Sequence, residues 1–388
     1  MQTKNHLPQP RYYQTKAYAH QWFFLAACVY AILIVPLMML ARHDYGPAVL
    51  AMPTGHAFEM LFGFALALIA GYLLGPMPRW RLALLLFFWL LARISGLVVS
   101  GTPLVLIGNA VFALLLAWQI LPRLWVAKKW RNRMLVPLLG LICFLIFFIA
   151  LLNHFDYQML QRYLLNESVL LFSLLMLYMG GRMLAPAIAG EFYRQGTELQ
   201  ARVQPRIEAG LIITVTTAFI LAPVSASIAG IMLITSGILA SIRLFRWQLW
   251  RCRSRPDLIC LGIGYSWLAL GLILLGLMKL NGSAYLSTAI HAITVGALGT
   301  LASNVIVRVS LLHCKQYPSC IKQILAITGS MAVAAILRLG ADISVHREIL
   351  LALSTVAWST SFVIVLIILL GCQVKSLPRK SVRAAAPH

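Results

Sequence analysis

Residues 56–74 read HAFEMLFGFALALIAGYLL, and this stretch decides how the chain must fold. It is apolar almost throughout, but two ionisable side chains, His56 and Glu59, stand near its start. A helix of about 20 mostly apolar residues crosses the hydrocarbon core of a bilayer. Charged side chains at the centre of such a helix cost about 2.5–3.5 kcal/mol or more each, so a function for the pair is the default hypothesis.

The composition of the whole chain agrees with a membrane protein. Of its 388 residues, 61% are hydrophobic and only 11% are charged, whereas soluble domains carry about 25% charged residues. The sequence therefore predicts an all-α, polytopic membrane protein with about twelve transmembrane helices. We expect a single domain over residues 1–388, with flexible tails at 1–19 and 375–388.

Hydropathy places the twelve spans between short polar loops. The run at 222–224 contains Pro223 and is compatible with one kinked helix or with two spans and a minimal loop. We expect the longest loop, 183–204, to form a surface helix. The predicted spans are 20–41, 56–75, 82–100, 103–121, 134–153, 167–185, 208–222, 225–245, 258–279, 285–308, 322–340 and 348–371.

The basic residues support this count. The formal net charge is +22, and 26 of the 32 lysines and arginines fall in the tails and on alternate loops of one side. This segregation follows the positive-inside rule and predicts both termini on the cytoplasmic side of a bacterial inner membrane. It explains the charge without nucleic acid, which we do not expect as a partner; the expected surroundings are the lipid bilayer. Arg93 lies within a span, and the other exceptions are Arg42, Arg162, Lys279, Arg338 and Arg347.

Two histidines fall at matching depth near the outer ends of different spans. His56 begins the second span, and His291 lies early in the tenth. Two imidazoles at one depth suit a bis-histidine haem or a copper site. His56 and Glu59 are three residues apart and share a helix face. The alternative is structural: an interfacial histidine, with Glu59 satisfied by a neighbouring arginine. No CxxCH motif is present, so any haem would be non-covalent and b-type.

Arg93 needs an anionic partner, for which Glu59 and a haem propionate both qualify. Met60 is a weaker candidate, as a thioether ligand of copper. Small residues at 63, 67, 71 and 75 form a stripe below His56. Such a stripe admits a second helix or a flat porphyrin, and helix packing is the favoured interpretation.

These motifs resemble the NnrS family over nearly the whole chain. The resemblance rests on the block at 56–64, on AGYLL at 70–74 with Pro78-Arg-Trp80, and on Gly181-Arg182 with Pro186. It also rests on HAITVGALGT at 291–300, followed by RVSLLH at 308–313.

The resemblance implies a twelve-span bacterial membrane protein that contains haem and copper. It also implies a role in denitrification and in tolerance of nitric oxide, with nitric oxide or iron–nitrosyl species as the expected ligands. Among the matching positions His56, Glu59, His291, Arg308 and His313, it implies His56 and His291 as haem or metal ligands, with His313 a further candidate. Arg93 and Glu59 are expected beside the cofactor. Many members carry a second histidine where this chain has Phe58, so haem loading without copper is compatible with the sequence.

Two other functions remain open at this point. A proton-coupled secondary transporter would use His56 and Glu59 as a proton relay or substrate site, since twelve spans are common among transporters. An assembly partner of a respiratory complex would bind neither cofactor nor substrate. The sequence does not decide whether the protein is an enzyme.

Overall fold

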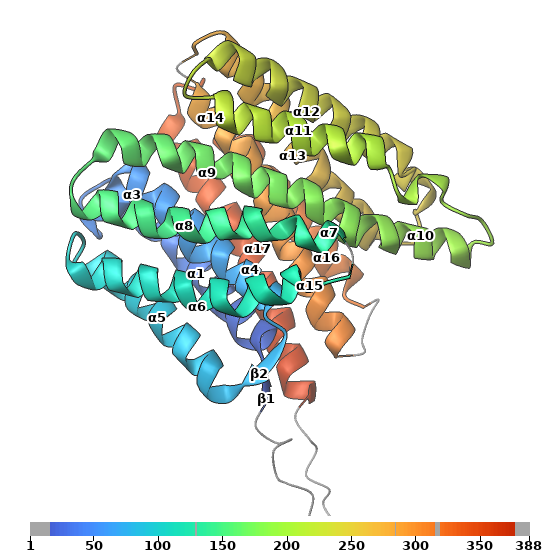
Figure 1. The fold of residues 1–388 in the computed structure, drawn as a ribbon, viewed down its shortest axis with the longest axis horizontal. Coiled ribbons are helices and arrows are strands. Elements are labelled where there is room, and N and C mark those ends of the chain that lie inside the picture. The colour runs from blue at the N-terminus through green and yellow to red at the C-terminus, as the bar shows by residue number, and fades with distance from the viewer. Residues whose placement is uncertain (1–15, 129, 284, 315–318, 377–388) are drawn as a thin grey trace, which may run out of the picture.

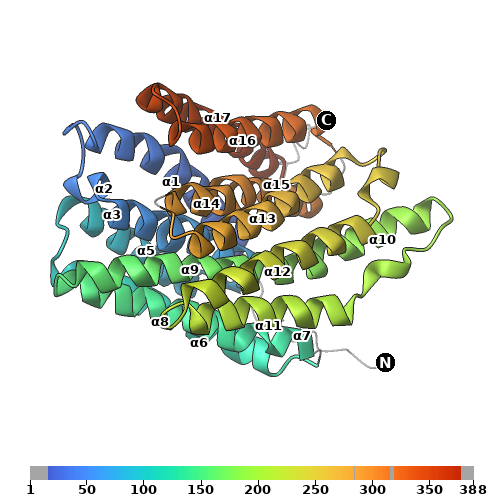
Figure 2. The same cartoon turned by 90° about the horizontal axis from the view of Figure 1, so that it is seen from above.

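The computed structural model describes residues 16–376 except 129, 284 and 315–318. Most of these residues are helical, and the helices lie side by side in one bundle (Figures 1 and 2). The predicted all-α class is confirmed. Most of both tails expected to be flexible, 1–19 and 375–388, lies outside the described residues. The part of the first tail that is described forms a short strand, β1.

The first half of the bundle contains six spans. Its elements are β1 (Lys16–Tyr18), α1 (Ala19–Ala41), α2 (Ala48–Ala51), α3 (Pro53–Phe58), the π-helix η2 (Glu59–Ala65), α4 (Leu66–Leu73), β2 (Pro76–Pro78), α5 (Arg79–Val98), α6 (Pro103–Trp125), α7 (Trp130–Arg133), α8 (Leu135–His154), α9 (Gln158–Met179), the π-helix η3 (Gly180–Leu184) and α10 (Ala185–Arg194).

The second half adds six more. Its elements are the 3₁₀ turn η4 (Gln200–Arg202), α11 (Pro205–Leu221), α12 (Ala226–Arg246), the 3₁₀ turn η5 (Leu249–Arg251), α13 (Pro256–Leu280), α14 (Leu286–His291), the π-helix η6 (Ala292–Gly299), α15 (Thr300–His313), α16 (Ile321–Ala341) and α17 (Arg347–Ser376).

The number of spans agrees with the predicted twelve. Within the described residues, eleven helical stretches are long and apolar enough to cross a membrane. The twelfth predicted span is α11, which has 17 residues and stands at the short end of the range of about 17–25 residues for a spanning helix. Residues 222–225 form a non-helical turn, so α11 and α12 are two helices rather than one kinked helix.

The loop 183–204 was expected to form a surface helix, and a helix, α10, does occupy residues 185–194, but it is not separate from the sixth span. Instead, α9, η3 and α10 form one continuous helical stretch from Gln158 to Arg194, and its α10 end projects beyond the neighbouring helices (Figure 1). The reason is local: Pro186 stands at the start of α10, where the helix tolerates proline because the π segment before it already interrupts the regular hydrogen-bond ladder.

The two described ends of the chain meet at one face of the bundle. β1 pairs antiparallel with β2, and the Gln373 side chain donates a hydrogen bond to the carbonyl of Gln21 at 2.9 Å. Trp358 on α17 donates to the carbonyl of Ala31 on α1 at 3.0 Å, which joins the last span to the first. An even number of crossings requires both ends on the same side, as observed.

Three spans contain a π-helical segment among the described residues: the second (η2), the sixth (η3) and the tenth (η6). A π segment inserts a wider turn and often marks a functional position. Glycines in these segments allow aromatic side chains of neighbouring helices to pack closely. A Cβ on Gly63 would lie 2.7 Å from the Tyr30 ring, and a Cβ on Gly296 would lie 2.7 Å from the Trp267 ring. The small-residue stripe of the second span thus packs against α1, as the helix-packing interpretation predicted.

Candidate functional site

A cavity of about 530 Å³ opens near the face opposite the chain ends, and we call it the histidine cavity. It lies between the second, sixth, tenth and last spans, together with the ends of α1 and α16. His56 and His291 both line it and are close enough to interact electrostatically. The volume falls within the range of about 300–1,000 Å³ typical of small-molecule and cofactor sites. The polar residues that line it are Arg42, Thr54, His56, Arg162, Asn166, Ser287, His291, Thr294, Arg338, Arg347, Ser354 and Thr355.

His291 is held in one orientation by its own helix. Its Nδ1 lies 2.7 Å from the carbonyl oxygen of Ser287, one turn earlier. The carbonyl can only accept, so Nδ1 carries the proton and the neutral ring keeps an acceptor lone pair on Nε2. Histidines that bind metals commonly donate the second ring nitrogen to a carbonyl in this way. His291 is therefore prepared to act as a ligand through Nε2.

His56 supplies the second imidazole and has an unsatisfied nitrogen. Its Nδ1 is buried and has no hydrogen-bond partner within the described residues. A buried polar atom left without a partner costs about 1–3 kcal/mol, and such atoms need an explanation in a native structure. The helix begins at Pro53, three residues before His56, which places the ring in the first turn of the span. A bound group would remove this penalty.

Arginines surround the two histidines, and sequence reasoning missed their convergence. Arg42, Arg162, Arg338 and Arg347 all line the histidine cavity. They are four of the five loop cations that departed from the positive-inside pattern, which was the only signal in the sequence. Arg162 forms no ion pair within the described residues, whereas Arg42 contacts Glu348 at 3.0 Å. Such a lining favours a ligand that carries carboxylates or other anionic groups.

Arg338 and Asp342, four residues apart, form a local ion pair, with Nη1 to Oδ2 at 3.0 Å. Asp342 also accepts from the Thr288 hydroxyl at 2.6 Å, and Arg338 donates to Ser287 Oγ at 3.2 Å. Burial raises the pKa of Asp342, but the Thr288 hydrogen bond and the Arg338 charge outweigh it and hold the pKa below its ordinary value. This cluster joins the end of α16 to α14, the helix that carries His291.

Glu59 and Arg93 lie outside the lining of the histidine cavity and satisfy each other. Arg93 Nη1 lies 2.5 Å from Glu59 Oε2, the same oxygen accepts from the Tyr30 hydroxyl, and Arg93 Nη2 donates to Asn109. Of the two partners considered for Arg93, the structure provides Glu59. The side chains of His56 and Glu59 are thus divided between two environments, one in the cavity and one in a closed network.

His313 lies far from His56 and His291. It ends the tenth span, and His291 stands near the start of the same span. Their separation of 22 positions in the sequence corresponds to about 33 Å of helix at 1.5 Å per residue. The His313 ring stacks on His20 with centroids 4.1 Å apart. The three histidines therefore do not share one metal. No group of three or more His, Cys, Asp and Glu side chains suited to a metal ion occurs in the described part of the chain.

Other outer histidines do not join the cavity lining. His154 Nδ1 lies 2.9 Å from the carbonyl of Gly101, and His43 lies beside Glu348 at the limit of ion-pair range, 4.0 Å. His346 is exposed. Met60 does line the cavity, with its thioether on the same helix as His56.

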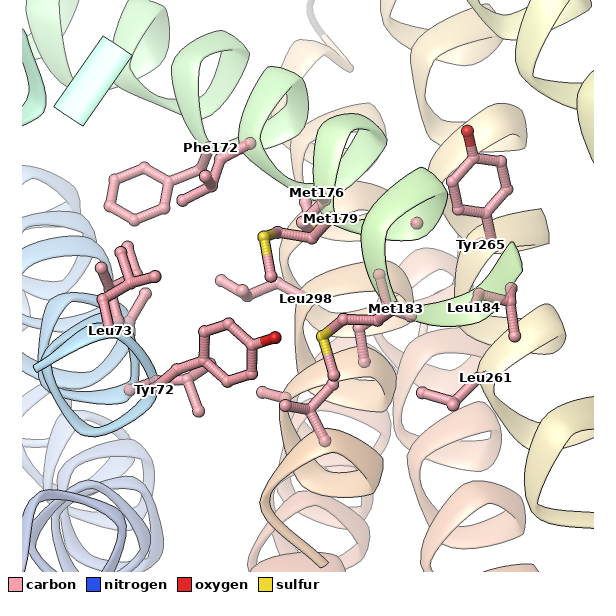
Figure 3. A pocket seen from close by; sticks show the side chains of 18 residues that line it. Tyr72, Leu73, Phe172, Met176, Met179, Met183, Leu184, Leu261, Tyr265 and Leu298 are labelled. Carbon is pink, nitrogen blue, oxygen red and sulfur yellow. The ribbon is translucent and has the colours of Figure 1, made fainter. Parts of the chain in front are cut away.

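A second, apolar chamber lies between the three π-containing spans and α13 (Figure 3). It measures about 110 Å³ and is lined almost wholly by carbon and sulfur, with Met176, Met179 and Met183 on one side and Tyr72 on the other. Leu298 lines both this chamber and the histidine cavity, so the two spaces adjoin. Apolar cavities of this kind stay dry and accept small apolar molecules.

Fold and cavity together define a polytopic α-helical membrane protein with a histidine- and arginine-lined cavity near one face. Comparison with protein families then gives the particular family. The NnrS family, described as NnrS protein, matches residues 15–374, and the chain belongs to this family. A comparison with curated proteins found no match.

Proposed function

We propose that this NnrS-family protein binds haem in the histidine cavity and acts in the bacterial response to nitric oxide. The observation that carries the proposal is the pairing of His56 and His291 at one cavity. His291 has a donor nitrogen fixed on the Ser287 carbonyl, and His56 has a buried nitrogen without a partner. Imidazole ligands of this kind hold b-type haem without covalent attachment.

The residues present fit the group. His56 and His291 would hold the iron, and the arginines at 42, 162, 338 and 347 would neutralise the two propionates with charge-assisted hydrogen bonds. Arg162 is the first choice because it has no ion pair within the described residues. When bound, the haem iron would supply the capacity to bind nitric oxide or to exchange one electron.

The apolar chamber supports a small uncharged ligand. Nitric oxide carries no charge and would enter an apolar, water-poor space more readily than an ion would. Leu298 lines both the chamber and the histidine cavity, so the two spaces adjoin. The chamber would therefore store or deliver the ligand from the bilayer interior.

Copper is the second proposed cofactor. Imidazole and thioether are ligands that copper accepts, and His56, His291 and Met60 line one cavity. Because haem and copper would use the same histidines, we propose that haem takes precedence in this chain. Copper at His313 would be a separate site at the opposite face.

The test is the absorption spectrum of protein purified after expression with ample haem. We expect a Soret band in the wild type that is lost or strongly reduced in His56→Ala and His291→Ala. His346→Ala, an exposed histidine near the same face, is the matched control and should keep the band. A wild-type protein without a Soret band contradicts the proposal. If the band persists in both alanine variants, haem binds elsewhere and the ligand assignment is wrong.

The transporter alternative gains less support from the geometry. A His56–Glu59 relay requires both groups on one proton path, but Glu59 accepts from Arg93 and Tyr30 in a closed network outside the cavity lining. Uptake driven by a pH gradient in haem-free proteoliposomes would favour the transporter over our proposal.

We propose that the protein lies in the bacterial inner membrane with both termini in the cytoplasm, because the face with the chain ends carries most of the basic loops. The histidine cavity would then open toward the periplasm. A C-terminal fluorescent protein that matures only in the cytoplasm should give signal, whereas a C-terminal periplasmic phosphatase should stay inactive.

A further inference from the structure

A second polar cavity, of about 470 Å³, lies at the opposite end of the sixth span from the histidine cavity, and we call it the inner cavity. It is formed by the end of α9, the π segment η3, the turn η4, α11 and α12. Neither the haem proposal nor the transporter alternative uses it. Its charged lining residues are Arg182, Arg202, Glu208 and Arg243.

Arg243 is the buried member of this set, with 3% of its surface exposed. Its Nη1 donates to the carbonyl of Leu177 at 2.9 Å, and its Nη2 donates to Glu208 Oε1 at 2.7 Å. The guanidinium also lies over the Trp247 ring, 5.1 Å from its centroid. Its Nε is buried without a hydrogen-bond partner in the described residues. The lining thus includes a buried cation, one nitrogen of which has no hydrogen-bond partner in the described residues.

The sixth span is shaped to admit this arginine. A Cβ on Gly181 would lie 2.1 Å from Arg243 Nη2, so no larger residue fits without a shift. Gly181 belongs to η3, and a π segment shifts the hydrogen-bond ladder so that a carbonyl becomes available to another donor. The Leu177 carbonyl, which accepts from Arg243, precedes that segment by three residues.

The cavity carries an excess of positive charge. Glu208 is already bonded to Arg243, while Arg182 and Arg202 are exposed and form no ion pair within the described residues. Loop arginines on this side follow from the positive-inside rule alone. Topology does not explain why three arginines from three separate elements converge on one cavity, nor why one of them is buried.

We propose that the inner cavity binds a phosphate group, supplied by an anionic lipid headgroup or by a free phosphate compound. Guanidinium groups recognise phosphate oxygens with paired, charge-assisted hydrogen bonds. Basic pockets between transmembrane helices suit phospholipid headgroups, and the apolar side chains of Leu174, Leu211 and Ile212 in the same lining suit an acyl chain. The inference does not depend on haem binding.

The experiment compares two double variants that remove the same charge. Arg182→Gln/Arg202→Gln alters the cavity, whereas Arg206→Gln/Arg246→Gln removes two exposed arginines outside its lining. Arg243 is left intact because its loss would unfold the site. Each protein is titrated in detergent with short-chain phosphatidylglycerol and, separately, with inorganic phosphate, and binding is followed by native mass spectrometry and thermal shift.

We expect phosphatidylglycerol binding by the wild type to weaken at least tenfold in the cavity variant and less than twofold in the control variant. Protection by inorganic phosphate alone would identify a free anion as the source, and protection by the lipid only would identify a headgroup; both support a phosphate site. Equal weakening in the two variants would mean a diffuse surface charge and would overturn the inference. So would the absence of binding to either probe in the wild type.

Discussion

Arg93 and Glu59 form an ion pair that is almost completely buried, with 2% and 4% of their surfaces exposed. Arg93 Nη1 lies 2.5 Å from Glu59 Oε2, Tyr30 donates to the same oxygen and Asn109 accepts from Arg93 Nη2, while Arg93 Nε has no hydrogen-bond partner in the described residues. The pair joins the second span, which also carries His56, to the third. It therefore supports the histidine cavity from outside without contributing to its lining.

Removing one member of the pair should destabilise the protein strongly. Arg93→Leu leaves the Glu59 carboxylate buried without a counter-charge, which costs about 3–5 kcal/mol. We expect a corresponding loss in the free energy of unfolding measured in detergent micelles. The double variant Glu59→Leu/Arg93→Leu should lose less than the sum of the two single variants, because neither charge remains. Additive losses would show that the two side chains act independently.

Gly63, which lies beside this pair, should not accept a larger side chain without a loss of stability. Gly63→Ala would place a Cβ 2.7 Å from Tyr30 Cε1 and 3.1 Å from Glu59 Oε2. Overpacking of this kind costs about 1–3 kcal/mol. Gly329→Ala is the control, because no atom lies within 4 Å of the added methyl group and alanine favours a helix interior by about 1 kcal/mol. Thermal unfolding should therefore shift downward for Gly63→Ala only, and a matching downward shift for Gly329→Ala would argue against the steric explanation.

The sequence was sufficient for the parts of the structure that depend on local composition. Apolar runs defined the spans, and loop charges agreed with an even number of crossings. The positions of His56 and His291 near the ends of their predicted spans placed the two side chains at the same depth in the membrane. The continuation of α9 into α10 was missed because Pro186 and the polar residues after it look like a loop, and the π segment between them leaves no periodic signature. The convergence of Arg42, Arg162, Arg338 and Arg347 depends on tertiary packing, so they appeared only as exceptions to a charge pattern.

Asp342, which contacts Arg338 and Thr288, should make the stability of the folded protein depend on pH, and the sign follows from its pKa. The Thr288 hydrogen bond and Arg338 hold its pKa below the ordinary value of 3.8. A carboxyl group whose pKa falls on folding stabilises the native state above the unfolded pKa, and this contribution is lost as pH falls through the folded pKa. At pH 7, Asp342→Asn should therefore lower the unfolding temperature, with a free-energy loss of about 1–3 kcal/mol for the charged hydrogen bonds.

The same comparison at low pH provides the check on this assignment. As pH falls below the ordinary value of 3.8 toward the lower pKa of the folded state, the contribution of Asp342 to stability declines, so the two unfolding temperatures should converge. Thr288→Val removes only the neutral donor and should produce a smaller loss at pH 7. A difference between wild type and Asp342→Asn that stays constant from pH 7 to pH 3 would contradict the role of the carboxylate charge.

Phe58 stands where the resemblance to the NnrS family implies a second histidine, and its environment predicts what a histidine would do at this position. Phe58 packs on Phe62 with centroids 5.3 Å apart, its ring lies 5.6 Å from the Arg93 guanidinium, and it is absent from the lining of the histidine cavity. Phe58→His would thus place an imidazole beside a buried cation, away from His56. We expect lower stability and no gain in bound copper per protein after copper loading.

Ala57 provides the contrasting position, because it does line the histidine cavity. Ala57→His should add an imidazole beside His56 and raise the copper bound per protein, measured by metal analysis after removal of loosely bound ions. Two and three nearby imidazoles form progressively better copper sites, so the gain should appear only at position 57. Extra copper in Phe58→His, with none in Ala57→His, would mean that the second span is rotated relative to the orientation described for His56, and the assignment of His56 to the cavity would fail with it.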